Sequence, residues 1–132
     1  MILVDTHALL WFLWGDAKLG SNAKRIIDRN VGRSALISAI SFCEIRFLLR
    51  GGRIDLNGRT AKEFRDHALA GGFIEKPMDG AIAIDAVDLA LPHRDPADRI
   101  IVATARAFGA VLLTADEKLL ASDAVETEDA RT

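Results

Sequence analysis

Short apolar runs alternate with longer segments of helical periodicity along the chain. The short runs have no helical repeat and are bounded by turn-forming or polar residues, which predicts buried strands at residues 2–4, 34–38, 73–76 and 110–114. Between them the apolar side chains recur every three or four positions, which predicts helices at residues 6–14, 21–30, 41–50, 60–70, 79–89, 95–108 and 117–120. This alternation predicts an α/β fold, a parallel sheet of about four to five strands with helices on both faces.

The helix expected at residues 95–108 has the clearest boundaries. Asp95 suits the N-cap, Pro96 suits the first helical position, and Gly109 ends the periodic segment. Six residues are expected on the packed side of this helix: Ile100, Ile101, Ala103, Thr104, Ala107 and Phe108.

The composition is that of one globular domain. Of the 132 residues, 50% are hydrophobic and 27% are charged, which excludes a disordered chain. No internal repeat or linker divides the sequence, so we interpret residues 1–132 as a single domain. Only residues 122–132, which are acidic and rich in small side chains, are expected to fray.

Charge and cysteine content narrow the range of functions. The net charge of −2 argues against a protein that binds nucleic acid through bulk positive charge, so any such contact must be local. The longest apolar stretch, residues 8–14, is far shorter than the ~20 residues of a membrane-spanning helix, and the N-terminus lacks the pattern of an export signal. The single cysteine, Cys43, suits a reducing compartment, and we expect a cytoplasmic protein.

Several common motifs are absent. The Gly51-Gly52 pair follows a predicted helix, and neither G-x-G-x-x-G nor G-K-[ST] occurs, which argues against nucleotide cofactors. The histidines His7, His67 and His93 lack the i, i+4 spacing of a helical zinc pair, so we interpret them as surface or capping residues. No serine has the G-x-S-x-G context of acyl-transfer enzymes.

Four carboxylates remain at the edges of apolar segments. Asp5 and Asp116 follow predicted strands, whereas Glu44 and Asp98 fall in the first turns of predicted helices. Because ligands of parallel α/β sheets bind beyond the carboxyl ends of the strands, these acids are expected to converge on one cleft. Their mutual repulsion would be relieved by a bound cation, and oxygen donors suit Mg²⁺ or Mn²⁺. Such a site is typical of phosphoryl transfer.

Two acids near these positions also have purely local explanations. Taken alone, Glu44 reads as an acid favoured by the helix dipole at a helix N-terminus. Asp95, one helical turn before Asp98, is interpreted as a helix cap.

The acids and their surroundings resemble those of a known family. Leu-Val-Asp-Thr-His-Ala-Leu-Leu-Trp around Asp5, Ile-Ser-Ala-Ile-Ser-Phe-Cys-Glu-Ile around Glu44, His-Arg-Asp-Pro-Ala-Asp-Arg-Ile-Ile-Val-Ala around Asp98 and Leu-Leu-Thr-Ala-Asp-Glu around Asp116 resemble a PIN domain. More narrowly, these blocks are similar to VapC-type ribonuclease toxins of type II toxin-antitoxin systems. The resemblance extends from residue 2 to about residue 121.

The resemblance implies a single-stranded RNA endonuclease that depends on Mg²⁺ or Mn²⁺. It also implies a dimer, or a hetero-oligomer with a VapB-type antitoxin whose C-terminal segment occupies the cleft. By position, Asp5 and Asp98 would be the principal metal ligands, and Glu44 and Asp116 would complete the catalytic acids.

Three residues beside the acids are assigned supporting roles, and one departure from the family pattern affects substrate binding. Thr6 and Thr114 are expected to orient the acids by hydrogen bonds, and Arg99 to contact phosphate or a neighbouring acid. Cys43 and Leu48 stand where many relatives have tryptophan and lysine, so the resemblance assigns no RNA-contact surface here.

Two alternative functions compete with the nuclease. The first is a PIN-fold binding or regulatory module with weak or no nuclease activity, acting through its antitoxin complex. The second is a phosphatase or phospho-acceptor domain with Asp5 as nucleophile. Against the second, Asp5 is followed by Thr6-His7 in place of another acid, and no lysine ends the last predicted strand.

Overall fold

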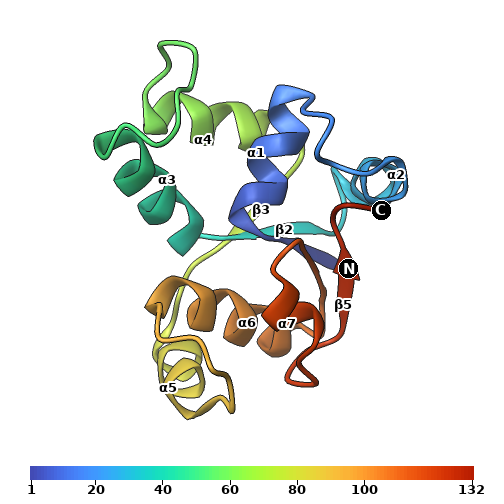
Figure 1. Ribbon diagram of the computed structural model, residues 1–132, viewed down its shortest axis with the longest axis vertical. Coiled ribbons are helices and arrows are strands. Elements are labelled where there is room, and N and C mark those ends of the chain that lie inside the picture. The colour runs from blue at the N-terminus through green and yellow to red at the C-terminus, as the bar shows by residue number, and fades with distance from the viewer.

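Five parallel strands form one sheet in the computed structural model, which describes residues 1–132 (Figure 1). The strands are β1 (Ile2–Val4), β2 (Ala35–Ser38), β3 (Ile74–Lys76), β4 (Val111–Thr114) and β5 (Thr127–Asp129). Their spatial order is β3-β2-β1-β4-β5. Leu3 of the central strand is in register with Leu36 on one side and with Leu112 on the other. The predicted α/β class and parallel sheet are therefore confirmed.

Seven helices connect the strands, as the sequence pattern predicted. They are α1 (Thr6–Trp14), α2 (Ser21–Asn30), α3 (Ile40–Arg50), α4 (Ala61–Ala70), α5 (Gly80–Asp88), α6 (Pro96–Phe108) and α7 (Glu117–Leu120). None of these helices has the length and apolar character that a membrane crossing requires.

The helices cover both faces of the sheet because successive strand residues point to opposite sides. Ile2 and Val4 pack with buried residues of α1, α2, α3 and α4, whereas Leu3 packs with those of α5, α6 and α7. Figure 1 shows the same division, with α1 to α4 on one side of the sheet and α5 to α7 on the other. Two apolar clusters therefore share the central strands.

The prediction for the packed side of α6 is partly wrong. Ile101, Ala103 and Thr104 are fully buried as expected, but Ala107 and Phe108 are exposed. The buried segment is continuous from residue 101 to residue 105, because the middle of α6 packs against the sheet, α3 and α5 at once. A helix surrounded on several sides does not have the single apolar stripe of a surface helix.

The prediction that residues 122–132 fray is wrong for residues 127–129. These residues form β5, which pairs with β4 and completes the sheet at that edge. Ala130, directly after β5, is completely buried in the apolar cluster beneath α1 and α2. The polar side chains of β5 conceal this strand in the sequence, since its pairing uses backbone groups only.

Candidate metal site

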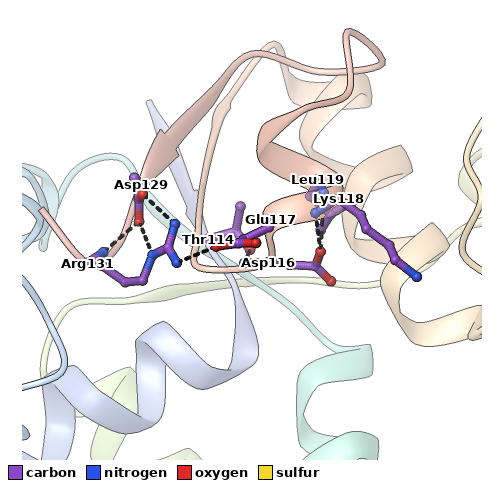
Figure 2. A network of polar contacts seen from close by, with 7 residues as sticks. All are labelled: Thr114, Asp116, Glu117, Lys118, Leu119, Asp129 and Arg131. Atoms are coloured by element: carbon purple, nitrogen blue, oxygen red, sulfur yellow. Dashed lines mark hydrogen bonds and ion pairs between the residues drawn. The ribbon is translucent and has the colours of Figure 1, made fainter.

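The carboxyl ends of two adjacent strands carry the first pair of acids. Asp5 follows β1 and caps α1, its Oδ1 accepting a hydrogen bond from the Thr6 backbone N–H at 2.8 Å. Asp116 follows β4 and caps α7, its Oδ1 accepting from the backbone N–H groups of Lys118 (2.9 Å) and Leu119 (3.2 Å) (Figure 2). Because β1 and β4 are parallel neighbours, both acids reach the same edge of the sheet.

Two helices bring the second pair of acids to the same place. Asp98 lies in the first turn of α6, as predicted. Glu44 was also predicted in a first helical turn, but α3 begins at Ile40 and has no acid in its first turn. The helix dipole therefore does not explain Glu44. Together with His7 and Ala115, the four predicted acids line one cavity of about 330 Å³.

Thr114 ties the two strand-end acids together. Its hydroxyl donates to Asp5 Oδ2 at 2.7 Å and accepts from the Asp116 backbone N–H at 3.1 Å. Thr6 donates its backbone N–H to Asp5 and its hydroxyl to Ser41 Oγ on α3 at 2.9 Å, and its side chain also acts to lower the pKa of Glu44 against the larger effect of burial. Both threonines thus hold Asp5 in place, one by its side chain and one by its main chain.

Burial and crowding make the acids unfavourable as free anions. Burial raises the pKa of Asp5 and of Glu44 above their ordinary values. Burial, together with the charges of Asp5, Asp95 and Glu44, raises the pKa of Asp98 to about 7. One oxygen of Glu44, Oε1, is buried without any hydrogen-bond partner. Ionisation of these acids is therefore disfavoured unless a cation lies between them.

Asp116 differs from the other three acids. Burial raises its pKa, but hydrogen bonds from His93 and from the backbone N–H groups of Leu119 and Lys118 outweigh this effect and hold the pKa below its usual value. Asp116 is therefore ionised over a wider pH range than the acids around it.

The possible ligand atoms fall into two groups that share Asp98. Glu44, Asp95 and Asp98 each offer an oxygen, and these atoms all lie within 4.8 Å of one another. His93, Asp98 and Asp116 form a second group with the same spacing. This carboxylate-rich set fits a hard divalent cation such as Mg²⁺ or Mn²⁺, and the buried, unpartnered oxygen of Glu44 is a vacant donor for it.

Asp95 has the predicted capping role but is not confined to it. Its Oδ1 accepts from the Ala97 backbone N–H at 3.0 Å, which confirms the helix cap. Its carboxylate nevertheless lies beside Glu44 and Asp98, and its charge raises the pKa of both. Asp95 is therefore both the cap of α6 and a neighbour of the acids in space.

His93 was misjudged from the sequence. The sequence pattern predicts a surface or capping residue, but the His93 side chain is only 6% exposed and its Nε2 lies 3.1 Å from Asp116 Oδ2. The available signal was its position in the His-Arg-Asp-Pro block that leads to Asp98. His7, by contrast, is exposed and lines the cavity beside Asp5 and Glu44.

Arg99 contacts neither a neighbouring acid nor the cavity, contrary to the prediction. All five N–H groups of its guanidinium donate to backbone carbonyls at the end of α5 and in the loop that follows. The acceptors are Ala86, Val87, Leu89, Leu91 and His93. The last carbonyls of a helix lack partners within that helix, and Arg99 satisfies them. No donor of Arg99 is left for a phosphate.

The last strand is fixed to α7 close to Asp116. The Asp129 carboxylate of β5 binds the Arg131 guanidinium, which also donates to Glu117 Oε1 at 3.1 Å (Figure 2). Glu117 directly follows Asp116, so this network connects the tail of the chain to the helix that Asp116 caps.

Fold and site together define a parallel α/β domain that gathers acids at the carboxyl edge of its sheet. The family model of the PIN domain matches residues 2–124. The chain belongs to the PIN domain family.

Solved structures support the same fold. VapBC2 from Rickettsia felis, bound to a DNA fragment from its promoter, has a chain with a TM-score of 0.70 at 16% identity, covering 97% of this chain and 98% of that one. A chain of DNA-bound VapBC from Salmonella typhimurium has a TM-score of 0.67 at 18% identity, with 98% of each chain covered. A chain of FitAcB from Neisseria gonorrhoeae has a TM-score of 0.64 at 21% identity, with 98% of each chain covered. No curated protein matches the sequence significantly.

Proposed function

We propose that this chain is a Mg²⁺- or Mn²⁺-dependent endonuclease of single-stranded RNA and the toxin of a VapBC-type toxin-antitoxin module. The observation that carries the proposal is the convergence of Asp5, Glu44, Asp98 and Asp116 on one cavity, where the pKa of the first three is raised with burial as the main cause. The PIN family membership and the sequence blocks around these acids support it.

Each acid has a distinct part in the proposed site. A divalent cation, when bound, would supply a positive charge for the scissile phosphate and an acidified water. Asp5 and Asp98 would be its principal ligands, and Asp116 would complete them. Glu44, whose buried Oε1 has no hydrogen-bond partner, would complete the acidic site as a further ligand, directly or through water. Thr114 keeps Asp5 aligned throughout.

The proposed partner is a VapB-type antitoxin, in a hetero-oligomer with this chain or with its dimer. The similar structures are named as VapBC and FitAcB assemblies, which supports a partner of this kind. A second cavity of about 570 Å³ adjoins the acids through Glu44 and Asp95 and is lined by apolar residues of α3 and α6, including Phe47 and Pro96. An antitoxin segment that entered this cavity would obstruct the acids.

Cleavage of a defined single-stranded RNA tests the chemistry. The wild type should cut it with Mg²⁺ or Mn²⁺ and not with EDTA. Asp5→Asn and Asp98→Asn should each abolish cleavage, and growth inhibition in cells, while the fold is retained by circular dichroism. Asp123→Asn, which changes an exposed acid that does not line the cavity, is the control and should remain active. Cleavage retained by both site variants would refute the assignment.

A PIN-fold regulatory module is the second candidate. It is favoured by similar structures that are DNA-bound, among them those from Rickettsia felis and Salmonella typhimurium. Under this alternative, coexpressed chain and antitoxin would bind promoter DNA, whereas the chain would bind no Mn²⁺ in calorimetric titration and would cut no RNA.

A further inference from the structure

The α5–α6 connection places one imidazole at the acidic site. His93 lies in this connection, and its side chain is only 6% exposed. Its Nε2 is 3.1 Å from Asp116 Oδ2, and its Nδ1 is buried without a hydrogen-bond partner. No step of the proposed reaction uses this residue.

The surroundings of the two ring nitrogens indicate where the proton lies. A proton on Nδ1 would leave a buried N–H without an acceptor and would set the bare Nε2 against a carboxylate oxygen. A proton on Nε2 makes a charge-assisted hydrogen bond to Asp116 and leaves only an acceptor unpaired. The second tautomer is the favoured one, so the His93 ring donates to Asp116.

This bond fixes the one Asp116 oxygen that α7 does not hold. Oδ1 already accepts the backbone N–H groups of Lys118 and Leu119 at the helix N-terminus. Oδ2 has His93 as its hydrogen-bond partner, and the group of ligand atoms at this point includes Asp98 within 4.8 Å. The orientation of the Asp116 carboxylate therefore depends on His93.

His93 is itself held by Arg99. The Arg99 guanidinium donates to the His93 carbonyl at 2.8 Å and to the Leu91 carbonyl at 3.1 Å. Its other bonds fix the end of α5 from which this connection starts. A chain of contacts therefore runs from Arg99 on α6 through His93 to Asp116.

We infer that His93 is a positioning residue, which orients Asp116 toward a divalent cation shared with Asp98. The inference rests on the proposed function, since it assigns a role within the same site. Hydrogen-bond partners of ligating carboxylates commonly contribute about 10- to 100-fold to metal affinity.

Two amide variants of His93 test whether a donor must stand at the position of Nε2 or whether any polar side chain suffices. The amide nitrogen of His93→Gln can occupy the place of Nε2, whereas that of His93→Asn is one methylene short of it. Mn²⁺ affinity, measured on the complete chain from the EPR signal of free Mn²⁺, should stay near the wild-type value in His93→Gln and fall about 10-fold in His93→Asn. Thermal unfolding in EDTA checks that both variants fold.

Kinetics and pulsed EPR report on Mn²⁺ binding itself, which would not change if His93 only stabilised the fold. His93→Asn should need more Mn²⁺ for half-maximal RNA cleavage and should recover most of the wild-type rate at saturating Mn²⁺. In pulsed EPR, the ¹⁴N couplings to bound Mn²⁺ should be the same in the wild type and in His93→Gln, because the imidazole does not bind the ion. A ¹⁴N coupling present in the wild type and absent from His93→Gln would show that His93 is a direct ligand and would overturn the inference.

The affinities also separate this inference from the proposed function. Equal Mn²⁺ affinity in the wild type, His93→Gln and His93→Asn would contradict the inference alone. Failure of the wild type to bind Mn²⁺ would contradict the proposed function and the inference together.

Discussion

Asp98 is the acid whose protonation is most disturbed by its surroundings. Burial and the negative charges of Asp5, Asp95 and Glu44 raise its pKa to about 7 in the folded chain. Between its ordinary value of 3.8 and about 7, the folded state therefore binds more protons than the unfolded chain does. The free energy of unfolding contributed by this group falls as the pH rises through that window.

The first prediction follows from this sign. In EDTA at pH 8, Asp98→Asn should be more stable than the wild type by about 1 kcal/mol, a modest value because Asp98 is only half-buried and solvent screens its charge. This corresponds to about 4 °C in the unfolding midpoint. Near pH 4 the difference should shrink, and Mn²⁺ at pH 8 should raise the midpoint of the wild type alone. A variant that is less stable than the wild type at pH 8 would contradict the raised pKa.

Thr114 offers a second test at the scale of one hydroxyl. Thr114→Val removes the bonds to Asp5 Oδ2 and to the Asp116 backbone while keeping the shape of the side chain. We expect Mn²⁺ affinity to fall about 10-fold and stability by about 1 to 2 kcal/mol, measured by titration calorimetry and urea denaturation.

Thr104→Val is the matched control for this variant. Thr104 is equally buried, but its hydroxyl bonds only the Ile100 carbonyl within α6. Its replacement should leave Mn²⁺ binding unchanged. If both variants bound Mn²⁺ as the wild type does, Thr114 would have no part in aligning the acids.

At the scale of elements, Arg99 of α6 fixes the end of α5 and the loop that leads to α6. Arg99→Met should destabilise the protein by about 2 to 4 kcal/mol in urea denaturation, because five carbonyls lose their partner at once. Arg106→Met on the same helix should cost less than about 1 kcal/mol, since Arg106 bonds Asp85 and the Ala124 carbonyl at the exposed surface. Equal costs for the two variants would argue against the structural role of Arg99.

The same elements show how far a single sequence can be interpreted. Asp5 and Asp116 were predictable because each directly follows an apolar strand, and the sheet rule then places both at one edge. His93 was not predictable in this way, since it lies in a loop without regular structure whose position depends on the hydrogen bonds from Arg99 to the loop carbonyls. The cap role of Asp95 was predictable from the local sequence, but its place beside Glu44 was not, because that depends on how α6 packs against α3.

For the whole molecule, the sheet order determines which parts of the chain support the site. β1 lies at the centre between β2 and β4, so Asp5 follows a strand whose two neighbours come from distant parts of the sequence. β5 covers the edge of β4, and Arg131 connects it to α7. The tail that the sequence pattern presented as frayed therefore supports the strand and helix that carry Asp116.

The start of α2 is where this tail ends, and it provides the last prediction. The Gly20 backbone N–H donates to the Ala130 carbonyl at 2.9 Å, and that of Asn22 donates to the Thr132 carbonyl at 3.0 Å. A Cβ at Gly20 would collide with the backbone of Arg131 and Thr132. We expect Gly20→Ala to destabilise the protein by about 1 to 3 kcal/mol, measured by urea denaturation, because either the tail or α2 must shift.

A truncation and a control glycine show whether the tail is the cause. Gly20→Ala should cost much less in a chain shortened by Arg131 and Thr132, since the colliding backbone is then absent, and the double-mutant cycle measures this coupling. Gly80→Ala, at the start of α5 with nothing near its Cβ position, should be neutral or slightly stabilising. If the cost of Gly20→Ala were the same in the full and shortened chains, the tail would not be packed on α2 in solution, and β5 would lose the contacts that anchor it beyond the sheet.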